Sequence, residues 1–478
     1  MTKILVIDEG TSSTRAAIYD ANLSRGDFNQ LAVPLLSPSP DIVEQDANLI
    51  WTQTKQVALQ AAKGQKIDRI GITNQRETTI IWDRATGKPV HNALVWQDRR
   101  GAELGAKMKA DGREKILNAK TGLLADPYFS GFKLNWLLEN IAGLRERADK
   151  GELAFGTVDS WLIWNLTEGK CHVTDASNAS RTGLYNIHTG SWDEELLEMF
   201  GVPRRMLPVV MDSNSTFGIC TLFGGEVPIT GVLGDQQAAL MGQNCVGVGE
   251  AKITFGTGAF LMAQLGKSPK NSTNQMLLTI ASEIDGKTNY AIEGAVLNAG
   301  TAIQWLRDEL GLITNAAESE AMASSLQDNG GVYLVPAFTG LGAPYWNASA
   351  RGLICGLGRG TTKAHIVRAA LEASAYQTFD LLEAMAKDGI NIEILRVDGG
   401  MAQNNFFCQF LADIIGLQVE RPQDLEMTAM GAARVAMGGR GEHGGGNYTR
   451  FNPQMNEATR DKNIQGWKKA IKATLIGN

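Results

Sequence analysis

The chain contains two similar strand-turn-strand segments, one at its N-terminus and one near its middle. In the first, an apolar run at 4–7 leads through Asp8 into a turn of glycine and hydroxyl residues at 10–14, and a second strand follows. A comparable unit lies at 251–262, where Gly256-Thr257-Gly258 form the turn. Because the same unit opens each part of the sequence, we expect a chain built from two related halves.

Helical and β-rich segments alternate between and beyond these hairpins. Helices are expected at 134–147, 302–310 and 364–387, and the short apolar runs among them read as strands. This mixture predicts an α/β fold of two domains, which we place at 1–242 and 243–478.

Composition excludes several classes of function. The 478 residues include 45 basic and 51 acidic side chains without blocks of one sign, and the net charge of −6 gives no footprint for nucleic acid or an anionic membrane. The five cysteines are scattered singly, as is typical of a reduced, cytosolic protein. No apolar run of about 18 residues is present, so no membrane span is expected. The partner is expected to be a small molecule.

Familiar nucleotide and metal motifs are missing from the sequence. There is no GxxxxGK[ST] phosphate loop and no HExxH, and the histidines lie far apart. The segment 439–444 does fit GxGxxG, but it neither follows a strand nor opens a βα unit. We interpret the glycine-rich tract 438–446 as a surface loop.

The first hairpin carries groups that suit a polyphosphate. Asp8 supplies a carboxylate at a strand end, the turn supplies consecutive hydroxyl donors, and Arg15 adds a cation. An ordinary polar β-turn would look the same. Thr257 between two glycines in the second hairpin favours the phosphate interpretation, because two such turns facing each other would hold a polyphosphate from both sides.

Asp235 stands where an apolar strand at 229–234 meets the start of a helix. Such an aspartate commonly caps the helix. The alternative is a general base, since phosphoryl transfer to an alcohol needs a carboxylate within hydrogen-bond reach of the attacking hydroxyl. Sequence position alone leaves both interpretations open.

Other polar positions suit a small polyhydroxy substrate. Arg76 and Glu77 follow a strand at 70–73, where they could bind hydroxyl groups or form a surface ion pair. Trp96 and Tyr128 could form an aromatic wall and a hydroxyl donor, or could be core residues. In the second half, a strand enters the glycine turn of 398–400 and then a helix, where backbone could approach an adenosine.

Twelve sequence blocks together resemble the FGGY carbohydrate kinases, in that family's order. They span residue 7 to about residue 433 and include IDEGTSSTR, NQRETT, DPYFSG, NASRT, GDQQAAL, FGTGAF and RVDGGMAQNNFF. NQRETT, DPYFSG and NASRT are particularly like the members that phosphorylate glycerol. The resemblance implies a ribonuclease-H-like architecture of two domains, as in actin, sugar kinases and heat-shock chaperone ATPases, with the active site in the cleft between the domains.

The resemblance also implies roles for individual residues, with ATP and Mg²⁺ as cofactors and a homo-oligomer, dimer or tetramer, as the assembly. Asp235 would be the general base. The residues implied to bind glycerol are Arg76, Glu77, Trp96, Tyr128, Asp235, Gln236 and Phe260. The residues implied to bind ATP are Thr11, Ser12, Ser13, Arg15, Thr257, Gly300, Gln304, Gly400 and Asn404. Asp8 would help hold Mg²⁺ through water.

The sequence departs from the family pattern at residues 8–10 among other places, and two other functions remain open. Asp8-Glu9-Gly10 replaces the more frequent Asp-Gln-Gly, from which we expect an additional acid near the phosphates. A kinase for a longer polyol such as erythritol would share most of the site. An actin-like or chaperone-like ATPase would need the hairpins but not the hydroxyl-binding set.

Overall fold

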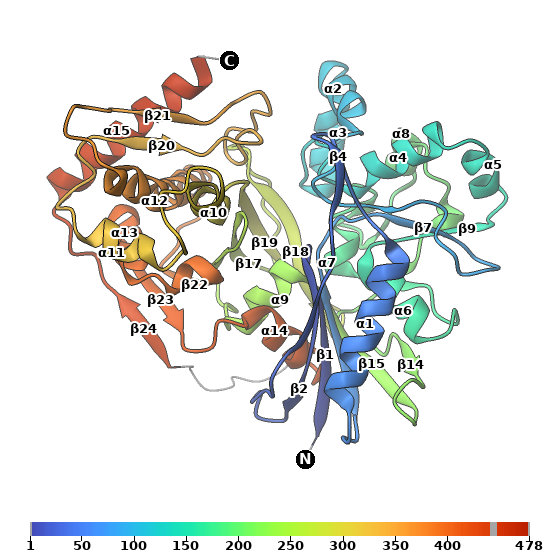
Figure 1. Ribbon diagram of the computed structural model, residues 1–478. Coiled ribbons are helices and arrows are strands. Elements are labelled where there is room, and N and C mark those ends of the chain that lie inside the picture. The colour runs from blue at the N-terminus through green and yellow to red at the C-terminus, as the bar shows by residue number, and fades with distance from the viewer. Residues whose placement is uncertain (1, 440–446, 477–478) are drawn as a thin grey trace.

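A computed structural model describes residues 2–439 and 447–476 of the chain. Figure 1 shows the two halves side by side, each built around a large sheet. The six-stranded sheet of the first half consists, in spatial order, of β14 (Gly218–Cys220), β15 (Val227–Gly234), β6 (Arg69–Asn74), β1 (Lys3–Glu9), β2 (Ser13–Asp20) and β3 (Asn29–Ala32). The seven-stranded sheet of the second half runs β18 (Leu277–Ile284), β19 (Lys287–Val296), β17 (Ala259–Gly266), β16 (Glu250–Phe255), β22 (Ile394–Asp398), β23 (Gln418–Pro422) and β24 (Tyr448–Phe451).

The two sheets repeat one topology. In the first half β1 pairs antiparallel with β2 and parallel with β6, which in turn pairs parallel with β15. In the second half β16 pairs antiparallel with β17 and parallel with β22, which pairs parallel with β23. The expectation of two related halves is therefore confirmed, and β18 is an extra strand at the edge of the second sheet.

Smaller sheets extend the two halves. They are formed by β4 (Leu36–Ser39), β5 (Ile42–Gln45) and β8 (Ala93–Leu94); β7 (Ile80–Asp83) and β9 (Leu153–Gly156); β10 (Val173–Asp175) and β13 (Val209–Met211); β11 (Tyr185–Asn186) and β12 (Ser191–Trp192); and β20 (Tyr333–Val335) and β21 (Leu353–Cys355).

The helices of the first half are α1 (Ala47–Ala62), α2 (Ala102–Ala110), α3 (Arg113–Thr121), α4 (Ser130–Asn140), α5 (Leu144–Asp149), α6 (Val158–Leu166), α7 (Ala176–Ala179), α8 (Glu194–Phe200) and α9 (Asp235–Gly242), with a 3₁₀ turn at Arg204–Met206. Those of the second half are α10 (Gly300–Asp308), α11 (Glu318–Ser324), α12 (Lys363–Lys387), α13 (Asn405–Ile415), α14 (Met427–Ala436) and α15 (Glu457–Ile476), with a 3₁₀ turn at Gly400–Gln403.

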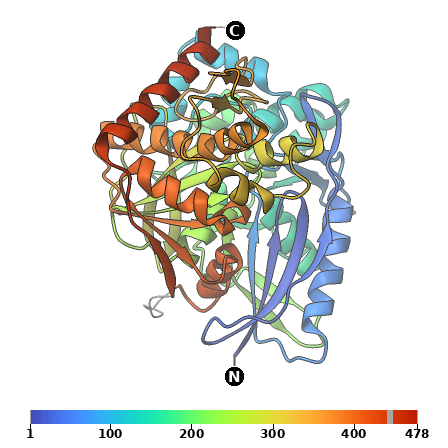
Figure 2. The same ribbon diagram turned by 60° about the vertical axis from the view of Figure 1, so that its left-hand side comes forward.

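Both faces of β1 are buried, which explains its continuous apolar run. Leu5 and Ile7 belong to the core that includes α1, whereas Ile4 and Val6 pack with the alanines of α14. In Figure 2, α1 runs along the outer side of the first sheet. Because successive side chains of a strand point to opposite faces, Asp8 continues the α14 side and Glu9 continues the α1 side.

Helices α9 and α14 lie between the halves, at the centre of Figure 1, and each packs on the other half's sheet. Leu240 of α9 packs with strands of the second sheet, and Ala433 of α14 packs under β1. Where the two helices cross, a Cβ on Gly431 would lie 1.8 Å from the Ala238 carbonyl oxygen. The crossing therefore requires glycine at this position.

Two predicted helices match the structure closely and one does not. The helix expected at 364–387 is α12, and the one expected at 302–310 is α10, shifted by two residues. The single helix expected at 134–147 is wrong, because α4 ends at Asn140 and α5 starts at Leu144. Gly143 takes a left-handed conformation (φ 74°) between them, which breaks the helical path. The predicted loop at 438–446 lies, from residue 440 onward, outside the described residues.

Candidate active site

A cavity of about 250 Å³ lies at the ends of the central strands of both sheets. All seven residues predicted to bind the polyol line it: Arg76, Glu77, Trp96, Tyr128, Asp235, Gln236 and Phe260. The hairpin residues Thr11, Ser12 and Thr257 line it as well. The fold thus brings together side chains that are up to about 250 positions apart in sequence, as residues 11 and 260 are.

Asp235 is the first residue of α9, and Gly234 precedes the helix as its cap. Its Oδ1 accepts the backbone N–H of Gln236 at 2.7 Å and lies 3.1 Å from Nε of Arg76. The side chain remains 29% exposed, so the carboxylate opens into the cavity. Burial raises the pKa of Asp235, and the charges of Arg76 and Lys252 counter part of that rise. A carboxylate with a raised pKa suits proton abstraction better than an ordinary helix cap does.

Arg76 and Glu77 occupy the connection after β6, and both are buried. The alternative of a surface ion pair is therefore wrong. Glu77 takes a left-handed conformation (φ 59°), which is unusual for a glutamate and turns its side chain beside that of Arg76. Both side chains line the cavity, one as a donor and one as an acceptor.

Three aromatic rings form one wall of the cavity. Trp96 meets Tyr128 edge to face at 5.7 Å and Phe260 edge to face at 5.9 Å between ring centroids. Its indole N–H donates to the Thr11 hydroxyl at 2.9 Å. This hydrogen bond links the aromatic wall directly to the first hairpin.

Both hairpin tips are tight turns with accessible donors. Gly10 N–H donates to the Ser13 carbonyl at 3.0 Å, and Gly256 N–H donates to the Gly258 carbonyl at 2.9 Å. Arg15 of β2 contacts the carboxylates of Asp8 and Glu426. Asp8, Arg15 and Glu426 thus place two acids and a cation at the base of the first turn.

Glu9 does not add an acid facing the phosphates, so that expectation is wrong. Its side chain is fully buried on the opposite side of β1 from Asp8, where Oε2 accepts the Thr54 hydroxyl of α1 at 2.9 Å. Burial raises the pKa of Glu9 to about 8. A neutral carboxyl group at this position resembles glutamine in shape and charge.

The predicted nucleotide residues gather beyond the second hairpin. Gly300 begins α10, and its N–H donates to the Gly256 carbonyl at 3.0 Å. Gln304 lies exposed one turn further along α10, and Gly400 is exposed in the 3₁₀ turn after β22. Asn404 caps α13 by accepting the Phe407 N–H. These four residues do not line the 250 Å³ cavity, so their assignment to the nucleotide stays a prediction.

Asp8 fits only one kind of metal site. Within the described part of the chain, no cluster of three or more His, Cys, Asp or Glu side chains could hold a metal ion. Mg²⁺ in kinases is commonly held by one or two carboxylates together with the phosphates of the nucleotide. Asp8 beside a phosphate-type turn, with Glu426 bound to the same Arg15, is consistent with that arrangement.

Several residues around the cavity escaped prediction. Lys252 lies fully buried on β16 and donates to Gln236 Oε1 and to the Thr254 hydroxyl, and burial lowers its pKa to about 8. Arg181 and Glu293 are buried behind Arg76 and Glu77. The sequence held a signal for Glu293, which stands between Ile292 and Gly294 in the apolar second part of β19, where a buried charge is expected only with a partner. Lys252 carried no such signal, because polar and apolar residues alternate along β16.

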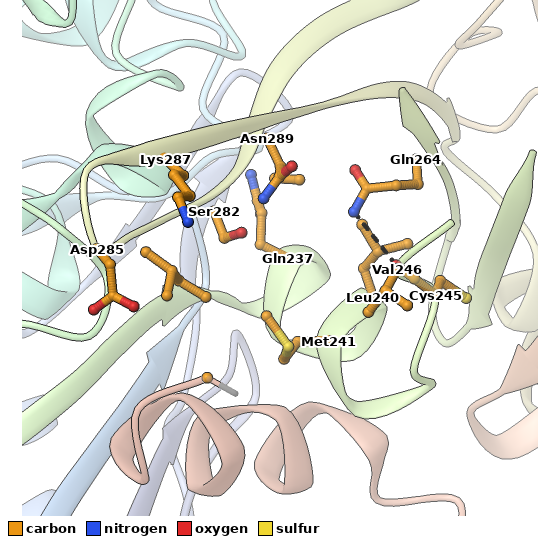
Figure 3. A pocket seen from close by; sticks show the side chains of 13 residues that line it. Gln237, Leu240, Met241, Cys245, Val246, Gln264, Ser282, Asp285, Lys287 and Asn289 are labelled. Atoms are coloured by element: carbon orange, nitrogen blue, oxygen red, sulfur yellow. Dashed lines mark hydrogen bonds between the residues drawn. The ribbon is translucent and has the colours of Figure 1, made fainter. Parts of the chain in front are cut away.

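A separate cavity of about 550 Å³ lies on another side of α9 (Figure 3). Gln237, Met241, Gln264 and Lys287 are among its lining residues. None of the predicted site residues lines it. The predicted polyol-binding residues therefore line the 250 Å³ cavity and not this one.

Two models of one protein family match this chain. The family model described as the FGGY family of carbohydrate kinases, N-terminal domain, matches residues 3–242, and the model for the C-terminal domain matches residues 251–439. The chain belongs to the FGGY family of carbohydrate kinases. The two-domain ribonuclease-H-like fold expected from the sequence is thereby confirmed.

This FGGY kinase is similar to curated relatives over nearly its whole length. It is 51% identical to a glycerol kinase of Rhodospirillum centenum, covering 99% of this chain and 98% of the relative. It is 50% identical to a glycerol kinase of Petrotoga mobilis, covering 98% of this chain and 97% of the relative.

Solved structures give the same family. The crystal structure of Plasmodium falciparum glycerol kinase with ADP superposes on this FGGY kinase with a TM-score of 0.92 at 36% identity, covering 99% of this chain and 98% of that one. A xylulose kinase from Lactobacillus acidophilus has a TM-score of 0.85 at 22% identity, which supports the shared fold alone. Among the described residues, no helix is both long enough and apolar enough to cross a membrane.

Proposed function

We propose that this kinase transfers the γ-phosphoryl group of ATP to a terminal hydroxyl of glycerol, giving sn-glycerol 3-phosphate. The observation that carries the proposal is the 250 Å³ cavity, which combines Asp235, a buried Arg76–Glu77 pair and an aromatic wall beside two hydroxyl-tipped hairpins. Sequence identities of 51% and 50% to glycerol kinases over nearly the full length support the choice of glycerol.

The cavity suits a small triol. Its volume of about 250 Å³ is at the small end of ligand sites, and its lining combines polar side chains with an aromatic wall. Arg76, Glu77 and Tyr128 would bind the hydroxyls that do not react. Trp96 and Phe260 would pack against the carbon chain.

Asp235 would act as the general base. Its carboxylate takes the proton of the reacting hydroxyl while that oxygen attacks the γ-phosphorus in line with the bond to the β-phosphate. The new P–O bond forms as the bond to the bridging oxygen breaks, and ADP leaves with that electron pair. Arg76, 3.1 Å from Asp235, stabilises the ionised carboxylate before the proton moves.

The phosphate groups would lie between the two hairpins. Hydroxyls and backbone N–H groups of Thr11, Ser12, Ser13 and Thr257 would donate to phosphate oxygens, and Arg15 would add positive charge. Mg²⁺, held near Asp8, would neutralise charge on the phosphates when bound. Gly300, Gln304, Gly400 and Asn404 would contact the rest of the nucleotide.

One observation favours a longer polyol as an alternative substrate. Leu35, Trp96, Gln97 and Tyr128 line both the polyol cavity and a neighbouring space of about 530 Å³, so the aromatic wall does not seal the site. A coupled ADP-release assay with glycerol, erythritol and xylulose tests this point. We expect the highest kcat/KM with glycerol, and a clear preference for either longer substrate would refute the glycerol assignment.

Asp235→Asn tests the base. Because asparagine cannot accept the proton, we expect kcat for glycerol phosphorylation to fall by about two orders of magnitude or more, with ADP affinity kept. Asp193→Asn is a matched control, since Asp193 caps α8 and asparagine caps equally well. Unaltered phosphorylation in Asp235→Asn would rule out the base assignment, and ATP hydrolysis without polyol dependence in the wild type would favour a chaperone-like ATPase.

We also propose a reduced, cytosolic setting. All five cysteines are free thiols, which is consistent with a reducing environment. The homo-oligomeric state stays a prediction, and analytical ultracentrifugation would test it.

A further inference from the structure

Behind Arg76 and Glu77 lies a second, fully buried Arg–Glu pair. Nε of Arg181 donates to Glu77 Oε1 at 2.6 Å, and Nη2 of Arg181 donates to Glu293 Oε1 at 2.8 Å. The other oxygen of Glu293 accepts from Nη1 of Arg76. The four side chains thus alternate in charge around a ring, and the substrate-facing pair forms one side of it.

The ring fixes which atoms remain for a substrate. In Arg76, Nη1 is held by Glu293 and Nε faces Asp235 at 3.1 Å, so Nη2 is the nitrogen left to meet a ligand. In Glu77, Oε1 is held by Arg181, so Oε2 is the oxygen left. Arg76 and Glu77 line the polyol cavity, whereas Arg181 and Glu293 do not. Any effect of Arg181 and Glu293 on the substrate must therefore pass through other residues.

Removing one member of the ring would leave a buried charge without its partner. The side chains of Arg181 and Glu293 are both 0% exposed, and a buried charge without a partner is strongly destabilising. Burial raises the pKa of Glu293, but the charges of Arg181 and Arg76 outweigh it, so the pKa lies below its ordinary value and Glu293 is ionised. The guanidinium carbon of Arg181 also lies 5.6 Å from the centroid of the Tyr128 ring, so Arg181 contacts a second residue of the polyol site besides Glu77.

Glu293 reaches this ring from the opposite half of the molecule. It lies on β19 of the second sheet, whereas Arg76, Glu77 and Arg181 belong to the first half. Gln237 of α9 supports the same guanidinium, since its Oε1 accepts from Nη1 of Arg76 at 3.3 Å. The side-chain amide of Gln237 then donates to the Ile280 carbonyl of β18 at 3.1 Å, beside the cavity in Figure 3. Arg76 is thus linked to the second half directly through Glu293 and indirectly through Gln237.

We propose that Arg181 and Glu293 are positioning residues for polyol binding: Glu293 carries the influence of the second half to Arg76, and Arg181 holds Glu77 and Tyr128. The proposal rests on the proposed glycerol phosphorylation. It assigns these two residues no contact with the substrate and no proton transfer. Their expected effect is on glycerol affinity, with nucleotide binding kept.

Glu293→Gln tests the proposal, because it keeps the size of the side chain and removes the charge between the two arginines. We expect KM for glycerol to rise about tenfold or more, because a misoriented Arg76 would lose about one charge-assisted hydrogen bond to glycerol. The ADP dissociation constant should stay within about twofold. We also expect glycerol to lose most of its stabilising shift in Tm, with the ADP-induced shift kept. These ligand-specific readouts separate positioning from a general loss of stability.

Glu372→Gln is the matched control. Glu372 also forms a buried ion pair, with Arg368 at 2.6 Å, but within α12 and outside the lining of the polyol cavity. Both variants are expected to lose stability, and only Glu293→Gln should lose glycerol affinity. Equal increases in glycerol KM for the two variants would overturn the proposal.

Arg181→Lys gives an independent result if Glu293→Gln does not fold. Lysine keeps the charge but cannot bridge Glu77 and Glu293 as a planar guanidinium does, so we again expect a raised glycerol KM with ADP affinity kept. If the wild type is active and a folded variant at either position keeps an unchanged glycerol KM, the positioning role is refuted and the proposed function is not. Absence of glycerol phosphorylation by the wild type would instead refute the proposed function.

Discussion

Two opposing effects act on the pKa of Asp235. Desolvation favours its neutral form, and the guanidinium of Arg76 together with the ammonium of Lys252 favours its ionised form. The balance leaves the pKa raised, so the carboxylate binds a proton more readily than an exposed aspartate would. That property belongs to the assembled site, because Arg76 follows β6 in the first half and Lys252 lies on β16 in the second half.

Asp380 gives a pH prediction at the same scale. Its Oδ2 accepts the Tyr345 hydroxyl at 2.9 Å and the Trp467 indole N–H at 2.8 Å, and burial raises its pKa to about 7. The folded protein binds this proton more tightly than the unfolded chain does, so protonation of Asp380 stabilises the fold at low pH. This contribution is lost as pH rises through about 7. Asparagine keeps an oxygen acceptor and does not ionise.

We therefore expect Asp380→Asn to gain stability relative to wild type as pH rises. Between pH 5 and pH 8 the difference in free energy of unfolding should shift in favour of the variant by about 2 kcal/mol. Denaturant titrations of both proteins at several pH values measure the difference. Parallel stability curves across this range would contradict the assignment.

At the scale of elements, the crossing of α9 and α14 depends on small residues. A Cβ at Gly431 would collide with backbone atoms of Ala238, and one at Gly242 would lie 1.9 Å from the Met427 carbonyl oxygen. Backbone cannot move aside as a flexible side chain can. Substitution here should separate the two helices.

We expect Gly431→Ala to lower the free energy of unfolding by about 2 kcal/mol or more, despite the higher helix propensity of alanine. Gly360→Ala is the control, because nothing lies within 4 Å of a Cβ at that exposed position. Thermal unfolding followed by circular dichroism compares the two. A Tm for Gly431→Ala equal to that of wild type would show that the helices separate without cost.

At the scale of the whole molecule, each predicted ligand site draws on both halves. The polyol cavity takes Arg76 and Tyr128 from the first half and Phe260 from the second, and the hairpins on its rim belong to one half each. A ligand that draws the halves together removes part of the ordering cost for the next ligand. Binding of glycerol and nucleotide should therefore be coupled.

We expect saturating glycerol to tighten binding of a non-hydrolysable ATP analogue about fivefold or more, and the analogue to tighten glycerol binding by the same factor. Isothermal titration calorimetry in both orders of addition measures the two factors. Identical dissociation constants with and without the other ligand would show that the two sites are independent.

The sequence supported some of these features better than others. The hairpins were predictable because a turn of glycine and hydroxyl residues separates two β-rich runs at 4–19 and again at 251–262. The break between α4 and α5 was missed because apolar periodicity continues across Gly143, whose left-handed conformation is a matter of local geometry. The side of β1 on which Glu9 is buried depended on α1 and α14, which lie far away in sequence.

The repeated hairpin by itself predicted two related halves, because residue type and local spacing are recorded directly in a sequence. The order of the motifs indicated the family, and the resemblance to that family implied the set of residues from Arg76 to Phe260 that line the cavity. Only the tertiary structure decided that Glu9 faces α1, that Arg181 and Glu293 complete a ring of charges, and that α9 and α14 cross through glycine. The physical reason is that burial and charge pairing depend on distances across the fold, and these distances arise only when distant segments pack together.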